Sequence, residues 1–312
     1  DNAEENTESA AYHEFSDTTN SLKLCGLYQY TMRDLVRQIF PANTMSDDER
    51  QQVEDYIAAY EQAKTDNAYT GLLQGKNVIM VQLEALDTWM IQPEYMPNLS
   101  QLKSESIAFT NHYTPAYITG TFNTEFMANT SLLPATGGIP TSVYTDDNYP
   151  FSLANLFRKA GYTARSFHNS EGNVYDRENI HRNLGYEKYY GGSALNMDEH
   201  ELDRQLINGF DAMTEKSPFF SFVITYSAHG PYGEDNVIYQ ENKDAAQAAA
   251  QRTDGNYVYA VAGAMETDRF IGELMDKPGE RPRQGHRPGL LRRPLQLLHD
   301  GRRPEHGAEG RG

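Results

Sequence analysis

The chain has 312 residues, a formal net charge of −17 and a single cysteine. The acidic balance argues against nucleic-acid binding, because phosphate contacts require clustered Lys and Arg. One cysteine cannot build a disulfide framework or a cysteine metal cluster. The length suits one large α/β domain with an added segment.

Residues 1–70 are expected to hold an acidic linker and surface helices. Residues 1–22 are polar and acidic, which is typical of a linker. From Ser46 the run SDDERQQVEDYIAAYEQAK combines a Ser cap, Glu49 three residues later and apolar residues at helical spacing, so it predicts a capped helix. No apolar stretch of about 18 residues and no signal peptide is visible. Because the chain begins at Asp1 rather than Met, we expect any membrane or targeting segment to lie upstream.

Three short runs predict buried strands that lead to polar side chains. The strand of GKNVIMVQLEALD ends at Glu84 and Asp87, the weaker one of GYTARSFHNS ends at His168, and that of SPFFSFVITYSAHGPYG ends at His229. Helical patterns lie between them: MPNLSQLKSES, FNTEFMANTSLL, SLANLFRKAG, DRENIHRNLG and a long stretch from 245 to 276. Alternating strands and helices predict an α/β fold with a central, mostly parallel sheet and helices on both faces. The site of such a fold lies at the carboxyl ends of the strands.

The loop YITGTFNTEF brings Thr121 directly before a predicted helix. Its hydroxyl could simply cap that helix. Alternatively, because a helix N-terminus favours anions, Thr121 could be a nucleophile toward a phosphate ester, activated by a divalent metal. Taken singly, Glu84, His168 and His229 are also compatible with solvated or packed side chains.

Several ordered motifs together resemble the extracellular catalytic domain of the lipoteichoic acid synthase family. They are NVIMVQLEALD, MPNLSQLKSESIAFTNHYTPA, GTFNTEFMANTSLLP, SFHNSEGNVYDRENIHRNLGY and PFFSFVITYSAHGPY. Members of that family are sulfatase-like phosphoglycerol transferases of the alkaline-phosphatase superfamily. The resemblance covers residues 22–276 and implies an alkaline-phosphatase/sulfatase-like sandwich, with the catalytic domain in residues 71–276.

The resemblance also implies roles for individual side chains. Glu84 would be a metal ligand, and Thr121 both nucleophile and metal ligand, with Mn²⁺ (or Mg²⁺) as the ion. The glycerophosphate pocket would be lined by His168, Tyr175, Arg177 and His229, with Arg177 and the histidines holding phosphate oxygens. Where the family often has Trp and Asn, this chain has Tyr175 and Asp176, and the added carboxylate is expected to weaken anion binding. Without the resemblance, Arg177 could equally be a surface charge at a helix start.

The implied reaction moves glycerol phosphate from a phosphatidylglycerol-type lipid, through a phosphothreonine at Thr121, to a growing glycerophosphate polymer. It would take place at the extracellular face of the bacterial cell membrane. A phosphoethanolamine transferase or phosphodiesterase of the same superfamily is one alternative, and a non-catalytic glycerophosphate-binding protein is another. A sulfatase activity is disfavoured, because its formylglycine precursor requires a C/S-x-P-x-R motif and Cys25 is followed by GLYQ.

Residues 277–312 have a different composition, with eight Arg and one Lys against four acidic residues. Prolines such as Pro288 and Pro294 argue against a central strand here. The adjacent Asp-His pair that would complete the family's metal site does not follow the long helix. This composition is typical of GC-rich DNA that is translated out of frame. A shift of one base in the reading frame permits an apolar strand that ends in Asp-His. The alternative is a genuine basic tail. We therefore expect a disordered tail, a sheet incomplete at its C-terminal end, and a chain that is inactive as it stands.

Overall fold

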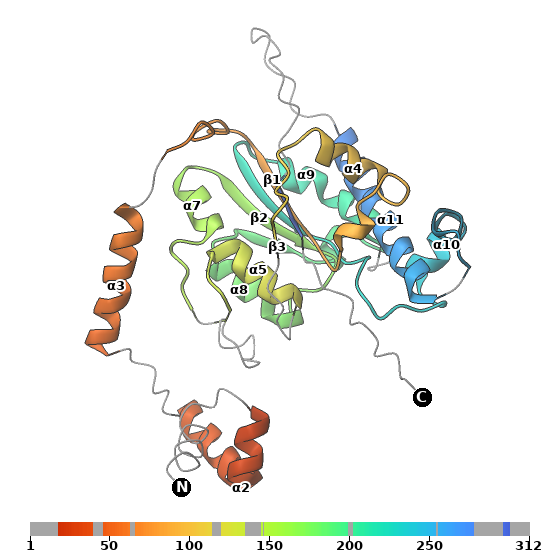
Figure 1. Cartoon of the computed structure of the whole chain (residues 1–312). Coiled ribbons are helices and arrows are strands. Elements are labelled where there is room, and N and C mark those ends of the chain that lie inside the picture. Colours follow the sequence, from red (N-terminus) through yellow and green to blue (C-terminus); the bar gives the residue numbers. More distant parts are fainter. Residues whose placement is uncertain are drawn as a thin grey trace. The chain divides into compact units, whose positions relative to one another are not determined.

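The computed structural model describes residues 18–39, 46–62, 66–113, 120–134, 145, 147–198, 202–253, 255–277 and 296–299. The chain divides into two compact units, one formed by residues 1–76 with 135–139 and the other by residues 77–134 with 140–312. The second unit contains every strand of the described residues (Figure 1). Candidate site residues therefore all belong to the second unit.

The first unit contains two described helices, α2 (Thr18–Ile39) and α3 (Asp47–Gln62). The predicted cap of α3 is confirmed: the Glu49 carboxylate accepts the Ser46 N–H at 2.9 Å, and Ser46 Oγ accepts the Glu49 N–H at 3.3 Å. The interpretation of residues 1–22 as linker is wrong from Thr18 onward, because polar residues are well tolerated in the first turn of a helix. Residues 1–17 lie outside the described residues.

The second unit is built on a parallel sheet with the strand order β3-β2-β4-β1-β5. Its strands are β1 (Val78–Leu83), β2 (Thr163–His168), β3 (Lys188–Tyr190), β4 (Phe219–Ile224) and β5 (Gln296–His299). The three runs predicted as strands form β1, β2 and β4, and β4 lies between the other two. The predicted end of the third strand at His229 is wrong, because β4 ends at Ile224 and residues 225–229 form a loop. The predicted α/β class with a parallel sheet is confirmed.

The helices that connect the strands are α4 (Pro97–Ser104), α5 (Gly120–Thr130), α7 (Leu153–Lys159), α8 (Arg177–Asn183), α9 (Phe210–Thr214), α10 (Val237–Ala250) and α11 (Gly255–Asp276). One long helix was expected up to residue 276, and this prediction is wrong. Gln251 and Gly255 both have positive φ, 53° and 85°, which ends α10 and separates it from α11. No described helix is both long and apolar enough to cross a bilayer.

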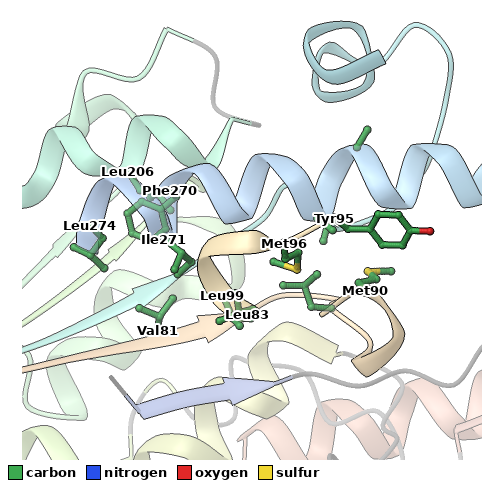
Figure 2. Packing of buried hydrophobic residues seen from close by; sticks show 14 of the residues in the cluster. Val81, Leu83, Met90, Tyr95, Met96, Leu99, Leu206, Phe270, Ile271 and Leu274 are labelled. Atoms are coloured by element: carbon green, nitrogen blue, oxygen red, sulfur yellow. The ribbon is translucent and has the colours of Figure 1, made fainter. Parts of the chain in front are cut away.

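Two hydrophobic clusters lie on opposite faces of the sheet. Alternate residues of β4 supply them: Phe220 and Phe222 pack in a cluster with α5, α7 and α8, whereas Val223 packs with α4, α10 and α11. Figure 1 shows these two groups of helices on either side of the strands. Figure 2 shows the second cluster, where Phe270 and Ile271 of α11 lie over β1. The result is a three-layer sandwich, because each face of a parallel sheet must be covered.

The strand β5 corrects the expectation that the basic segment 277–312 provides no strand. Residues 296–299 pair in parallel with β1, and Leu83 lies opposite His299. Without β5, β1 would be an edge strand with unpaired backbone groups. The strand can form after Pro294 because an edge strand tolerates a nearby proline. Residues 278–295 and 300–312 lie outside the described residues.

Truncation of Phe222 should strongly destabilise the second unit. Its side chain is fully buried in the middle strand, so Phe222→Ala is expected to lower the free energy of unfolding by about 3–5 kcal/mol. Urea denaturation followed by circular dichroism measures the change. Phe151→Ala is the control, because Phe151 is 77% exposed; equal losses for the two variants would contradict the assignment of the core.

Candidate active site

The candidate site begins at the carboxyl ends of three neighbouring strands. Ile224 at the end of β4 pairs with Gln82 of β1 on one side and with His168 of β2 on the other. These residues form one row across the sheet, so the residues that follow them emerge at the same edge. This edge is the usual position of a ligand site in an open parallel sheet.

Glu84 follows β1 and is buried, with 1% of its surface exposed. Its backbone N–H donates to Thr225 Oγ1 at 3.0 Å, which ties the end of β1 to the residue after β4. Nε2 of His229, which belongs to the same loop after β4, lies 4.0 Å from Glu84 Oε1. The structure therefore brings the predicted Glu84 and His229 together, with the histidine side chain about one-third exposed.

Thr121 lies in the first turn of α5 and is 8% exposed. Because α5 begins at Gly120, Thr121 is inside the helix, and the alternative of a simple N-cap is wrong. Nε2 of Gln82 donates to the Thr121 carbonyl oxygen at 3.2 Å. This bond holds the start of α5 against β1, two residues before Glu84.

His168 ends β2 and is 2% exposed. Burial lowers its pKa well below the usual range, and the positive charge of Arg177 lowers it further. The imidazole is therefore neutral near pH 7. Nδ1 lies 3.0 Å from the Ile224 carbonyl oxygen, which can only accept, so Nδ1 carries the proton and Nε2 keeps a lone pair.

Arg177 begins α8 and is 1% exposed, so the alternative of a surface charge is wrong. Its Nε and Nη2 donate to Glu125 Oε1 at 3.0 and 2.8 Å, and Nε also lies 3.1 Å from Oε2. This leaves Nη1 as the guanidinium nitrogen not committed to that carboxylate. Glu125 Oε2 also contacts His181 Nε2 at 3.0 Å, and His181 Nδ1 contacts Ser166 Oγ at 2.8 Å.

The pair of Glu125 and Arg177 is fully charged. Burial by itself raises the pKa of Glu125, but the charge of Arg177 and the hydrogen bonds from His181 and Arg177 outweigh it and lower the pKa to about 2. Burial also opposes the charge of Arg177, and Glu125 reverses this and raises the pKa of the guanidinium. Arg177 is therefore a cation whose charge is largely compensated, and its charge acts on the pKa of His168.

Tyr175 is held in an unusual backbone conformation beside Arg177. Tyr175 and Asp176 have φ values of 59° and 55°, a region that costs non-glycine residues of the order of 1–3 kcal/mol each. The Tyr175 ring lies 4.9 Å from the Arg177 guanidinium carbon and 6.2 Å from the Phe122 ring. Since Phe122 follows Thr121, these contacts join the 175–177 segment to the start of α5.

Two further buried side chains have polar atoms without a hydrogen-bond partner among the described residues. They are Oε1 of Gln82 and both amide atoms of Asn169, which directly follows His168. Leaving such an atom unsatisfied costs about 1–3 kcal/mol. A polar ligand at the strand ends would offset this cost.

The described residues do not provide a complete metal site. They contain no group of three or more His, Cys, Asp or Glu side chains arranged to hold an ion. Glu84 and Thr121 alone offer one carboxylate and one hydroxyl, fewer donors than the ligand set that the resemblance implies. The donor chemistry therefore does not fit the implied Mn²⁺ site as a whole.

The comparison with known families agrees with this architecture. The sequence matches the family model described as Sulfatase over residues 76–281. The chain belongs to the sulfatase family. The match includes every candidate site residue from Glu84 to His229.

Curated relatives of this sulfatase-family chain include lipoteichoic acid synthases. It is 25% identical over 281 residues to lipoteichoic acid synthase 1 of Bacillus subtilis (strain 168), covering 84% of this chain and 42% of the relative. It is 26% identical over 282 residues to the lipoteichoic acid synthase of Staphylococcus aureus (strain USA300), covering 82% of this chain and 41% of the relative. The chain thus spans about two fifths of the length of these relatives.

A solved structure supports the fold. The crystal structure of the lipoteichoic acid synthase LtaP from Listeria monocytogenes superposes with a TM-score of 0.55 at 23% identity, covering 68% of this chain and 55% of that one. At this identity the likeness concerns the fold alone. It agrees with the parallel sheet and its two helical layers.

Sequence reasoning missed Glu125, His181 and Asn169. A signal existed for Glu125, since a charged residue between the apolar Phe122 and Phe126 of one predicted helix suggests a buried partner. His181 and Asn169 carry no comparable signal, because polar residues within a helix or after a strand are usually solvated.

Removal of the Glu125 carboxylate should destabilise the protein and change its pH dependence. Glu125→Gln leaves Arg177 buried without a counter-charge, which is expected to cost about 3–5 kcal/mol. The folded pKa of about 2 lies below the ordinary 4.5, so this group stabilises the fold above pH 4.5, and that contribution is lost as the pH falls toward 2. Urea denaturation between pH 3 and pH 7 should show a steeper acid loss for the parent chain than for Glu125→Gln.

The double variant Glu125→Gln/Arg177→Met is the control, because it removes both charges. Its free energy of unfolding should exceed the value expected from adding the two single losses. Simple additivity would show that the two side chains do not stabilise each other.

Proposed function

We propose that this chain is the glycerophosphate-binding core of a phosphoglycerol transferase, in which Thr121 receives the glycerophosphoryl group. The observation that carries the proposal is the attachment of the Thr121 turn to β1 through Gln82, two residues before the buried Glu84. A hydroxyl in the first turn of a helix, at a strand edge that also carries Glu84 and His229, suits a phosphate ester. Membership in the sulfatase family and the relatives named lipoteichoic acid synthase support it.

In the proposed complex, Arg177 and His229 hold phosphate oxygens, His168 binds a glycerol hydroxyl, and Tyr175 covers the glycerol. His168 Nε2 carries a lone pair, so it accepts a hydrogen bond from a glycerol hydroxyl and does not hold a phosphate oxygen as the resemblance implied. Nη1 of Arg177 is available to donate to the phosphate, since Nε and Nη2 are used by Glu125. Gln82 Oε1 and the Asn169 amide suit the hydroxyl groups of glycerol.

The proposed transfer has two displacements at phosphorus. Thr121 Oγ forms a bond to phosphorus while the bond from phosphorus to the diacylglycerol oxygen breaks, and that oxygen takes a proton. A hydroxyl of the acceptor then bonds to the same phosphorus and releases Thr121 Oγ, which regains a proton. The donor is a phosphatidylglycerol-type lipid, the acceptor is a glycerophosphate polymer, and the reaction is located at the extracellular face of the bacterial cell membrane.

A second candidate is a non-catalytic glycerophosphate-binding protein. The incomplete ligand set within the described residues favours it, since the resemblance implies a metal that activates Thr121. For the chain as given we therefore propose binding with little or no turnover. The two candidates share the pocket and differ only in the fate of Thr121.

Glycerol phosphate binding tests the proposal directly. Titration of the chain with sn-glycerol phosphate, followed by two-dimensional NMR, should give saturable shifts that inorganic sulfate does not reproduce at equal ionic strength. His229→Ala and Tyr175→Ala should each weaken binding about 10-fold or more, the loss of one charged hydrogen bond or ring contact. Tyr69→Ala, an exposed tyrosine of the first unit, is the control; no binding by the parent chain would refute both candidates.

Covalent labelling separates the two candidates. After incubation with phosphatidylglycerol and Mn²⁺, intact-protein mass spectrometry should detect a glycerophosphoryl adduct only if Thr121 reacts. Thr121→Val should abolish the adduct, whereas Thr124→Val should retain it, because Thr124 Oγ1 is engaged with the Gly120 carbonyl. An adduct that persists in Thr121→Val would refute the role of Thr121.

Mn²⁺ should bind weakly to the chain as given. We propose Glu84 and Thr121 as ligands, and loss of even supporting groups commonly costs about 10- to 100-fold in metal affinity. Isothermal calorimetry should give weak binding that Glu84→Gln removes. Tight stoichiometric binding would mean that other residues, such as His299 or His306, complete the site.

A further inference from the structure

Residues 225–229 form the loop after β4, and the buried carboxylate of Asp203 binds this loop. Asp203 begins the 3₁₀ helix η4 (Asp203–Gly209) and has no exposed surface. Its Oδ1 accepts the Tyr226 N–H at 2.7 Å and its Oδ2 accepts the Ser227 N–H at 3.0 Å. In return, the Asp203 N–H donates to Ser227 Oγ at 2.9 Å. Backbone and side chain of the loop are thus both bound to η4.

Helix α11 closes the same anchor from the other side. The Thr267 hydroxyl donates to Asp203 Oδ2 at 2.7 Å. One turn earlier, Gly263 lies so close to the loop that a Cβ atom would be 2.4 Å from the Ser227 carbonyl oxygen and 2.9 Å from Ala228 Cα. Such distances leave no room for a side chain, so the helix backbone itself presses on the loop.

Keeping a carboxylate at this buried position destabilises its ionised form. Burial raises the pKa of Asp203 to about 6, opposed by the hydrogen bonds from Thr267, Tyr226 and Ser227, and the negative charge of Glu266 raises it further. Glu266 is itself paired with Arg204 at 2.9 Å. Asparagine, of similar size, would avoid this cost, but it has one acceptor oxygen where Asp203 uses two, and its NH₂ group would face one of the N–H groups.

The anchored loop leads directly to the candidate site. Ser227 and Ala228 are buried, and His229 follows them with its Nε2 4.0 Å from Glu84 Oε1. The His229 ring also stacks on Tyr226, with centroids 5.4 Å apart. The imidazole is therefore carried by a loop in which Asp203 binds two consecutive N–H groups, those of Tyr226 and Ser227.

We propose that Asp203 is a positioning residue that holds loop 225–229 so that His229 stays beside Glu84 at the strand ends. Asp203 does not touch the site and acts through the Tyr226 and Ser227 backbone. The effect on glycerol phosphate binding rests on the proposed function, whereas the effect on the loop does not.

The test compares two isosteric variants of buried aspartates, Asp203→Asn and Asp268→Asn. Asp268 lies on α11 directly after Thr267 and is 3% exposed. It also accepts two backbone N–H groups, from Leu99 at 2.8 Å and Asn98 at 3.1 Å, but these belong to α4. The two variants therefore remove equivalent interactions from different segments.

Hydrogen–deuterium exchange of the full chain measures the exchange rates of the loop amides. NMR titration with sn-glycerol phosphate measures the affinity of the site. Asp203→Asn should speed exchange at Tyr226 to His229 by about 10- to 100-fold, the equivalent of a lost hydrogen bond to a charged group. It should also weaken glycerol phosphate binding several-fold. Asp268→Asn should speed exchange in α4 and leave both the loop and the binding unchanged.

Unchanged loop exchange in Asp203→Asn, or equal acceleration in Asp268→Asn, would overturn the proposal. Faster exchange with binding equal to that of the parent chain would overturn the positioning of His229. If the parent chain binds no glycerol phosphate, the proposed function fails, and loop exchange alone decides the role of Asp203. Should Asp203→Asn not fold, Thr267→Val removes one donor to the same carboxylate, and unchanged loop exchange in that variant would overturn the proposal.

Discussion

The parallel pairing of β1, β2 and β4 is the constraint on which the candidate site depends. Because Gln82, Ile224 and His168 share one row of the sheet, the residues that follow each strand emerge at the same edge. Glu84, Asn169 and the loop that carries His229 are consequently neighbours, although they are far apart in sequence. The helical layer adds the rest, since Gln82 binds the first turn of α5.

Two buried carboxylates support this edge by different physical means. Glu125 is paired with Arg177, and its low pKa of about 2 shows that the pair stabilises the ionised form. Asp203 is surrounded by neutral donors, and its pKa is raised to about 6 because these donors do not fully replace water. The first carboxylate orients a cation, and the second orients a backbone segment. Each acts on the site from outside it.

At the edge of β1, the hydrogen bonding of the main chain does not depend on the side chains that a metal site would need. The strand β5 pairs with β1 through its main chain, so it satisfies hydrogen-bonding groups whatever its side chains are. A metal site needs particular donors at the strand end, and the described residues do not supply a full set. The sheet of this sulfatase-family chain therefore forms without a full set of metal donors among the described residues.

The sequence alone determined the α/β class, the three strands β1, β2 and β4, and the side chains at their ends, because branched apolar runs and their polar boundaries are local patterns. It also determined the cap of α3, which depends on Ser46 and Glu49 only. It did not predict the break between α10 and α11, which depends on two residues with positive φ, or the short strand β5. Only the tertiary structure decided that Arg177 is paired with Glu125, 52 residues away, and that Asp203 anchors the loop of His229. The physical reason is that a buried charge is defined by the partners that surround it, and those partners come from distant segments that meet only after the sheet has formed.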